Sequence, residues 1–423
     1  MKTHYKTALE RDANDPLAGF RKEFVSEDSL IYLDGNSLGK LPQKTIELTA
    51  DLVQKEWGNR LIRGWNENWI DLSKRMAQKI APLVGAQEDE IFVGDSTSLN
   101  LYKLVFASLK AQEGKTKIIS DDLNFPTDLY VIQGLIQHQF NKHQLELLKS
   151  KDDICIEDSQ WRSQIDKQTA LVCLSHVVYK SAFMYPMKEV TDWAHQNKSL
   201  ILWDLSHSVG AVDVALNESN ADMAVGCTYK YLNGGPGAPA FLYVRGDLQE
   251  KLLNPISSWF GHEKPFDFDL NYQAHSSIQK FAVGTPNILS LAAIEPGLDI
   301  TRKAGLRAIR QKSVFQTQFL WDLIEAELLP LGFQFASPKD SEKRGSHISI
   351  QHPEAYRINR AMIEPTSSSK VMIPDFRPPN NMRLGIAPLY TAYVDLWETV
   401  VRMKEILIHK EYERFSIEKL KVT

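Results

Sequence analysis

From Glu90 to about residue 300, short apolar runs and amphipathic segments alternate along the chain, whereas the first thirty residues are charged and irregular. After the run EIFVGDS, the residues Leu101, Leu104, Val105 and Leu109 recur at the spacing of one helix face. The other runs typical of strands are KIISDD, ALVCLSHV, LILWDLS, MAVGCTYK and AFLYVR, and KEVTDWAHQN between two of them has a helical pattern. This alternation predicts an α/β domain built around a mainly parallel sheet.

The pattern changes after about Ile300. Residues 301–328 have helical periodicity, HISIQH is typical of a strand, and a polar stretch with Pro365 and Ser367 to Ser369 follows. A last strand-like run precedes an amphipathic helix that should begin near Ala392. We therefore expect a large domain at 31–300 and a smaller C-terminal α+β domain at 301–423, with residues 1–30 as an N-terminal arm or part of the smaller domain.

The composition narrows the class of protein. With 423 residues, 43% of them hydrophobic, the chain suffices for two or three units with a sizeable core. A net charge of -4 and a pI near 6.3 indicate no nucleic-acid partner and no solvated acidic tail. We find no signal-peptide pattern and no run near the ~20 apolar residues that span a bilayer. Cys155, Cys173 and Cys227 lack metal-ligand spacing, so we expect reduced thiols and a cytoplasmic protein.

Two polar residues end apolar runs where an α/β sheet binds its ligands. LILWDLSH is apolar until Asp204, and DMAVGCTYKYLNGGPG is apolar until Tyr229 and Lys230. Pyridoxal 5′-phosphate (PLP) needs both groups, because a lysine amine forms the imine and a carboxylate keeps the pyridine nitrogen protonated. Taken alone, a lysine after a strand is more often an ordinary surface residue.

Two further segments fit the same cofactor. In GDSTSLN, the hydroxyls of Ser96, Thr97 and Ser98 precede a helix, whose free N–H groups and dipole favour a phosphate. An ordinary helix cap would use the same residues. In NFPTD, Phe125 could stack on a planar ring and Asp128 could accept a hydrogen bond from the ring hydroxyl, although FPTD is also a common turn.

Together, these segments resemble the kynureninases in type and in order along the chain. The resemblance covers roughly residues 30 to 400 and includes EWGNRLIRGWNENWIDLSKRM. Its most specific motifs are YLDGNSLGKLP, FPTD, WDLSHSVGAV, TYKYLNGGPG, WFGHEKPF and MRLGIAPLY. Kynureninases are homodimeric PLP enzymes of fold type I, in the aspartate-aminotransferase-like superfamily with class V aminotransferase-like relatives. The resemblance therefore implies a large PLP-binding domain with a mainly parallel sheet and a smaller C-terminal domain.

The resemblance also implies a role for each matching residue. Lys230 would bind PLP covalently and then move protons, and Asp204 would pair with the pyridinium. Tyr229 would contribute a phosphate contact and is the nearest phenol for proton transfer. The remaining cofactor-binding positions within one subunit are Thr97, Ser98, Phe125, Asp128, Ser175 and His207.

Other matching positions concern the substrate and a second subunit. Trp259 and Thr285 match positions that complete the phosphate site of the partner subunit, which implies a homodimer with active sites at the interface. Arg383 matches the arginine that binds the substrate α-carboxylate, and His207 would approach the substrate as well as the cofactor. Trp65 is a candidate wall for the substrate ring, with core packing as the alternative. Simple packing, helix capping and surface ion pairing would equally explain Trp259, His207 and Arg383 outside this family.

One stretch departs from the family pattern. In HVVYKSAFMYP, Val178 and Ala182 stand where kynureninases commonly have a polar residue and a glycine, while Tyr179 and Ser181 are retained. The departure concerns substrate preference and proton handling more than the cofactor.

The implied reaction is hydrolysis of L-kynurenine, or 3-hydroxy-L-kynurenine, to anthranilate, or 3-hydroxyanthranilate, and L-alanine, as in tryptophan catabolism and NAD biosynthesis. The motifs do not distinguish the two substrates. The alternatives on this scaffold are a β-lyase, a desulfurase, an aminotransferase or a non-catalytic PLP-binding dimer. A desulfurase needs a nucleophilic cysteine on a mobile loop, and none of the three cysteines lies in a Gly/Ser-rich segment.

Overall fold

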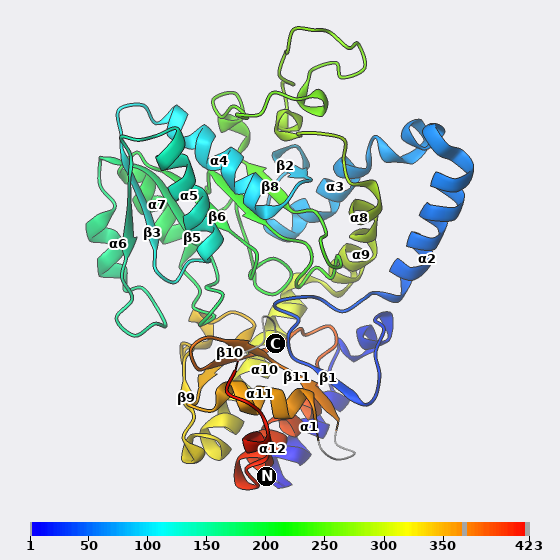
Figure 1. Ribbon diagram of the computed structural model, residues 1–423, viewed down its shortest axis with the longest axis vertical. Coiled ribbons are helices and arrows are strands. Elements are labelled where there is room, and N and C mark those ends of the chain that lie inside the picture. The colour runs from blue at the N-terminus through cyan, green and yellow to red at the C-terminus, as the bar shows by residue number, and fades with distance from the viewer. Residues whose placement is uncertain (1, 366–369, 419–423) are drawn as a thin grey trace.

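Seven strands form the central sheet of the upper lobe of the molecule (Figure 1). The computed structural model describes residues 2–365 and 370–418, so part of the polar stretch at 365–369 lies outside the described residues. The strand order is β2-β8-β7-β6-β5-β3-β4. The bounds are β2 (Ile91–Val93), β3 (Lys117–Asp121), β4 (Gln144–Leu148), β5 (Thr169–Ser175), β6 (Leu200–Asp204), β7 (Met223–Gly226) and β8 (Phe241–Val244).

The sheet is mainly parallel, as the alternation of strands and helices predicted. Strands β4, β3, β5, β6 and β7 pair in parallel, whereas β8 runs antiparallel to both β7 and β2. Every residue of β5 is buried, which explains its continuous apolar sequence, because helices cover both faces of such a sheet. Ile119, Val172 and Trp203 face one helical layer, and their neighbours Ile118 and Leu171 face the other.

The helices of the upper lobe form these two layers. Side chains of α3, α6 and α7 share a core with one face of the sheet, and those of α4 and α5 share a core with the other face. The bounds are α2 (Gln43–Asp51), α3 (Leu72–Val84), α4 (Thr97–Ala111), α5 (Pro126–His138), α6 (Asp158–Gln164), α7 (Met187–Gln196), α8 (Ile288–Ala293) and α9 (Glu295–Ala304).

The lower lobe combines both ends of the chain (Figure 1). Its antiparallel sheet has the order β12-β13-β10-β9, and β1 pairs in parallel with β11. The bounds are α1 (Lys2–Ala13), β1 (Leu30–Tyr32), α10 (Leu306–Glu327), β9 (Gln334–Phe335), β10 (His347–Gln351), α11 (Ala355–Ile363), β11 (Val371–Ile373), β12 (Asp375–Arg377), β13 (Asn381–Gly385) and α12 (Tyr393–Ile408). Helix α1 packs against α12, and Ala8, Ile31 and Leu33 belong to the same core as α10.

Single-turn and irregular helices connect these elements. Residues 52–69 continue α2 as an extension at the side of the upper lobe, made of the π-helical η2 (Leu52–Arg60), η3 (Leu61–Arg63) and the π-helical η4 (Trp65–Trp69). The remaining 3₁₀ turns are η1 (Ala18–Glu23), η5 (Glu88–Glu90), η6 (Gly246–Leu248), η7 (Trp259–Gly261), η8 (Ile278–Phe281), η9 (Leu329–Leu331), η10 (Ser341–Lys343) and η11 (Glu411–Arg414).

The structure corrects one predicted element and adds several others. The helical segment predicted at 301–328 is two helices, because Gly305 has a φ of 80° and ends α9 before α10 begins. Helix α5 and strand β4 were not predicted; the exposed alternate residues of β4 make it less apolar than the central strands. Within residues 2–365 and 370–418, no helix is both long and apolar enough to cross a membrane.

Candidate active site

The candidate site lies at the carboxyl ends of the parallel strands. Ser175 ends β5, Asp204 ends β6, and the two are paired neighbours in the sheet. Lys230 follows β7 by four residues. Helices α4 and α5 begin at this edge with Thr97 and Pro126, so both helix N-termini face it. The edge therefore combines a cation, a carboxylate and two anion-favouring helix ends.

One cavity brings together nine of the residues singled out in the sequence, plus Thr127 and Ser206. Its lining is Thr97, Ser98, Phe125, Thr127, Asp128, Ser175, Asp204, Ser206, His207, Tyr229 and Lys230. Thr127 and Ser206 lie inside the motifs FPTD and WDLSH, so their position within those motifs was the available signal. The side chains come from five separate stretches of the chain.

Lys230 is held beside a neutral imidazole. Its Nζ lies 2.9 Å from Nε2 of His207. Burial, followed by the charge of Lys230, lowers the pKa of His207 well below its usual range. The ring is therefore neutral and Nε2 accepts from the lysine, which leaves the proton on Nδ1, a buried atom with no hydrogen-bond partner within residues 2–365 and 370–418.

The two carboxyl groups of the cavity differ in how strongly they hold a proton. Burial raises the pKa of Asp204, opposed by Lys230 and by hydrogen bonds from Ser206, whose backbone N–H donates at 2.7 Å. Burial and the neighbouring Asp204 raise the pKa of Asp128 well above its usual range. Asp204 is thus the more acidic member of the pair and the better partner for a pyridinium nitrogen.

Hydrogen bonds beneath the cavity position its aromatic residue. Ser175 donates to Oδ1 of Asn124 at 2.7 Å, and the same oxygen accepts from the backbone N–H of Phe125 at 2.8 Å. The Phe125 ring, 39% exposed, packs edge-on against Tyr179 with ring centroids 5.2 Å apart. Phe125 therefore has one face available to a planar ligand, whereas Ser175 acts on the loop that carries it.

Arg383 lies outside this lining and is fully buried in the lower lobe. Its Nε donates to Asp375 at 2.5 Å, and its terminal nitrogens donate to the Tyr179 carbonyl at 2.7 Å and to Ser37 at 2.8 Å. Asp375 had no signal in the sequence, because its contact with Arg383 depends on the pairing of β12 with β13. Ser37 lies in the motif DGNSLG, which the structure thus connects to Arg383.

His347 is a second buried histidine that the sequence did not reveal. It lies on β10, and its ring centroid is 5.8 Å from that of His207. Burial, followed by the charges of Arg383 and Lys230, lowers its pKa well below the usual range. The polar boundary between Lys230 and Arg383 therefore contains two neutral imidazoles.

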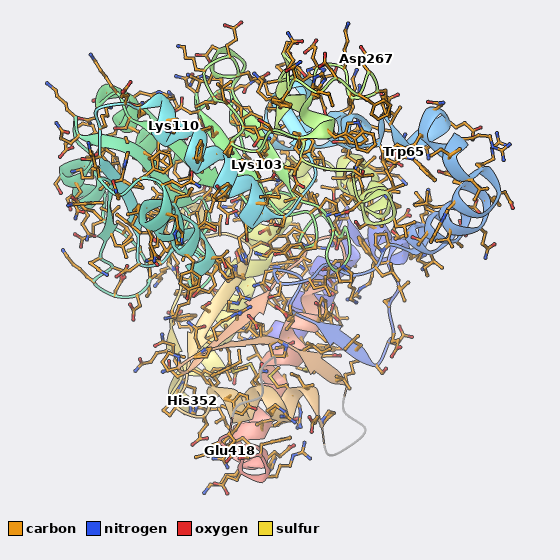
Figure 2. All side chains as sticks on the ribbon, turned by 45° about the horizontal axis from the view of Figure 1, so that its top comes forward. Trp65, Lys103, Lys110, Asp267, His352 and Glu418 are labelled. Atoms are coloured by element: carbon orange, nitrogen blue, oxygen red, sulfur yellow. The ribbon has the colours of Figure 1, made fainter. Side chains whose placement is uncertain are left out.

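Three further predicted positions do not line this cavity. Trp259 is 42% exposed and packs on Phe260, with centroids 4.8 Å apart, and Thr285 is exposed. Trp65 lies on η4, between Trp69 at 5.7 Å and Phe260 at 5.9 Å. Figure 2 places Trp65 at the side extension, away from Lys103 on α4.

The two departures from the family pattern have a structural explanation. Ala182 has a φ of 66°, a conformation that costs an alanine about 1–2 kcal/mol and a glycine almost nothing, which explains the usual glycine. Burial of the Ala182 methyl group stabilises the fold by about 0.8 kcal/mol, which offsets part of this cost. Val178 is fully buried in the main core and does not line the cavity. A valine in place of the usual polar residue therefore changes the packing of the core and not the lining of the cavity.

The three cysteines are free, and Cys173 and Cys227 are buried as their apolar surroundings predicted. Cys155 is the partly exposed one, and burial followed by Asp152 raises its pKa to about 11. Its thiol is therefore a poor nucleophile at neutral pH, which argues against desulfurase chemistry.

The groups present fit PLP. The cavity holds a lysine amine, a carboxyl group, hydroxyls at a helix N-terminus and an available aromatic face. Apart from the neighbouring carboxyl of Asp204, the buried Oδ2 of Asp128 has no hydrogen-bond partner among the described residues, so a polar group of a ligand can reach it at no loss to the fold.

Comparisons with known proteins identify relatives of the whole chain. The family model of the kynureninase C-terminal domain matches residues 309–403. The kynureninase of Pseudomonas fluorescens is 39% identical over 409 residues, which cover 96% of this chain and 95% of that enzyme.

Solved structures show the same fold at low identity. A cysteine desulfurase from Thermococcus onnurineus NA1 superposes with a TM-score of 0.79 at 19% identity, covering 93% of this chain and 98% of that one. A variant of C-DES with glycine covalently linked to its PLP cofactor superposes with a TM-score of 0.79 at 15% identity, covering 91% and 99%. Both show a PLP fold type I architecture, the α/β fold class that the sequence predicted.

Proposed function

The chain belongs to the kynureninase family, and from this membership we propose that it hydrolyses L-kynurenine, or its 3-hydroxy analogue, at the cavity around Lys230. Water and substrate yield anthranilate, or 3-hydroxyanthranilate, and L-alanine. The observation that carries the proposal is the convergence of Lys230, Asp204 and the hydroxyls of Thr97 and Ser98 on one cavity. Each of these groups has a role in binding PLP.

Within this proposal, the cavity residues each bind a different part of the cofactor. Lys230 binds PLP covalently, and Asp204 pairs with the ring nitrogen. Thr97, Ser98 and Tyr229 hold the phosphate at the start of α4. Bound PLP supplies an electron-accepting ring, which makes loss of the Cα proton feasible.

Lys230 moves the proton from Cα, and His207 keeps the amine available for this task. Because the imidazole is neutral and accepts from Nζ at 2.9 Å, it orients the lysine without repelling it as a second cation would. The same neutral ring leaves its Nδ1 proton to donate to the substrate.

Arg383 binds the substrate α-carboxylate in this proposal. Asp375 contacts both Nε and one terminal nitrogen of its guanidinium, and the terminal nitrogens also donate to two neutral acceptors, the Tyr179 carbonyl and the Ser37 hydroxyl. A substrate carboxylate competes well with these two neutral acceptors, because hydrogen bonds between two charged groups are about twice as strong as neutral ones. Trp65 is proposed as an aromatic wall beside the substrate ring.

We also propose a homodimer in which Trp259 and Thr285 complete the phosphate site of the other subunit. Both are exposed and absent from the cavity of their own subunit. Apolar side chains are also exposed in the upper lobe (Figure 1), on 52–63 (Trp57, Leu61 and Ile62) and on 266–270 (Phe266, Phe268 and Leu270). Exposed apolar surface of this kind is typical of an interface. Three free cysteines support a reducing, cytoplasmic location.

Borohydride reduction followed by mass spectrometry tests the attachment, and anthranilate fluorescence tests the reaction. We expect a reduced PLP adduct on the peptide with Lys230, no adduct in Lys230→Ala, and anthranilate release from kynurenine by the wild type alone. A PLP-loaded wild type that releases product from neither kynurenine nor 3-hydroxykynurenine contradicts the substrate assignment. An adduct on a different lysine contradicts the site.

A further inference from the structure

Lys103 is a fully buried lysine on α4, two turns beyond the predicted phosphate-binding hydroxyls of Thr97 and Ser98. Its ammonium donates to a carboxylate oxygen of Asp95 at 2.5 Å, to Oδ1 of Asn100 at 3.0 Å and to the carbonyl of Phe281 at 2.7 Å. Burying a charged lysine costs free energy. The three contacts of this ammonium therefore indicate that its charge has a function.

The carboxylate that Lys103 contacts stands at the start of the phosphate-binding helix. Asp95 precedes the cap residue Ser96 and has a φ of 58°, and its carbonyl accepts from Ala240 at 2.8 Å. Asn100 secures the same turn by donating to the carbonyl of Gly94 at 2.9 Å. The turn 94–96 is thus fixed on both sides, with a negative charge two residues before Thr97.

An ionised carboxylate at this position opposes the binding of a phosphate. Two like charges within several ångströms repel each other, most strongly where protein partly excludes water. The Asp95 side chain is only 21% exposed, so water screens its charge incompletely. Burial lowers the pKa of Lys103 and the charge of Asp95 opposes that shift, so the two groups stabilise each other as an ion pair.

We propose that Lys103 is a positioning residue for the cofactor phosphate, which acts by neutralising Asp95 at the turn where α4 begins. The ion pair lets an aspartate shape the turn without repelling the phosphate that Thr97 and Ser98 bind. This inference rests on the proposed PLP function and adds a residue that does not line the cavity. A lysine that only braced the turn would act through its contacts and not through its charge.

PLP binding to the purified apo-protein separates charge from bracing. The dissociation constant is measured with PLP and with 4′-deoxypyridoxine 5′-phosphate, which has the ring and the phosphate but cannot form an imine. The variants are Lys103→Met, the double variant Asp95→Asn with Lys103→Met, and Lys110→Met. Lys110 lies on the same helix in contact with Phe106 and Phe140, and Figure 2 labels both lysines. Lys110→Met is therefore the matched control.

Charge neutralisation predicts a specific order of affinities. Lys103→Met should weaken both ligands by at least about tenfold, and by more at low than at high salt. The double variant, which lacks both charges, should recover to within about threefold of the wild type, and Lys110→Met should match the wild type. If Lys103→Met does not fold, the double variant is the remaining test. Near-wild-type affinity of this variant, which lacks both charges, supports the charge effect.

Two results overturn the inference. One is an unchanged dissociation constant in folded Lys103→Met, and the other is a double variant that remains at least about tenfold weaker than the wild type. Both results presuppose a wild type that binds PLP, so they leave the proposed function intact. A wild type that binds no PLP at any concentration overturns both proposals.

Discussion

Several ionisable residues in and beside the site are buried in surroundings that disfavour their charged form. His207 of the upper lobe and His347 of the lower lobe are neutral because burial and nearby cations lower their pKa values. Burial, followed by the neighbouring charge of Asp204, raises the pKa of Asp128 well above its usual range. Since these groups disfavour charge, a bound ligand such as PLP or an amino-acid substrate would supply or remove charge at this site.

Asp121 offers a measurable pH effect outside the cavity lining. It is fully buried, accepts from Tyr185 at 2.7 Å and from the backbone of Leu123 at 2.8 Å, and burial raises its pKa to about 6 from an unfolded value of 3.8. The folded state therefore holds this proton more tightly than the unfolded state. The stability from this group is fully present below pH 3.8 and is lost as the pH rises to about 6.

Replacing Asp121 with asparagine should remove this dependence. We expect Asp121→Asn to gain stability relative to the wild type as the pH rises from 4 to 7, by up to about 3 kcal/mol, since each pKa unit corresponds to about 1.4 kcal/mol. Urea denaturation at several pH values measures the difference. A difference that stays constant over this range contradicts the raised pKa of Asp121.

At the scale of elements, the loop 34–41 and the segment 228–237 form one structural unit. The backbone N–H of Gly39 donates to the carbonyl of Tyr229 at 2.8 Å. A Cβ on Gly39 would overlap the carbonyl oxygen of Lys230 and the side chain of Asn233. The glycine in DGNSLG is therefore required for close approach to the backbone that carries the lysine.

Gly39→Ala should reduce activity through the position of Lys230. Because the overlap is with backbone, the lysine segment must shift, and a displacement of about 1 Å lowers catalytic rates by about a hundredfold. We expect a loss in kcat of this order, measured by anthranilate release, with the protein still folded by circular dichroism. Gly19→Ala is the matched control, since a Cβ there meets no atom within 4 Å. Equal activity of the two variants contradicts the proposed contact.

At the scale of the whole molecule, the two lobes bring together groups from both ends of the chain. The lower lobe supplies Arg383 and His347, the upper lobe supplies Lys230 and His207, and Ser37 contacts Arg383 from the N-terminal segment. If Trp259 and Thr285 serve the other subunit, a complete site also needs a second chain. The subunits of a closed dimer then each depend on the other.

Mixing two inactive variants tests this dependence. Lys230→Ala is mixed and refolded with the double variant Trp259→Ala, Thr285→Ala. Random exchange makes half of the dimers mixed, and each mixed dimer has one intact site, so about a quarter of wild-type activity should return. Each variant alone should stay inactive or nearly so. If Trp259 and Thr285 served their own subunit, every site in the mixture would be defective and no activity would return.

Local patterns along the chain were sufficient for the parallel core and for part of the cavity lining, whereas Ser175 and His207 came from the resemblance to the kynureninases. Strand ends are read from where an apolar run stops, so Asp204 and Lys230 were found, and Thr97 and Ser98 were found from a helix start. The tertiary structure alone decided the antiparallel direction of β8 and the break at Gly305. It also decided the pairing of Arg383 with Asp375 and of Lys103 with Asp95 and Phe281. The reason is physical: periodicity and capping depend on neighbours within a few residues, whereas the partner of a buried charge is set by which distant segments the fold brings together.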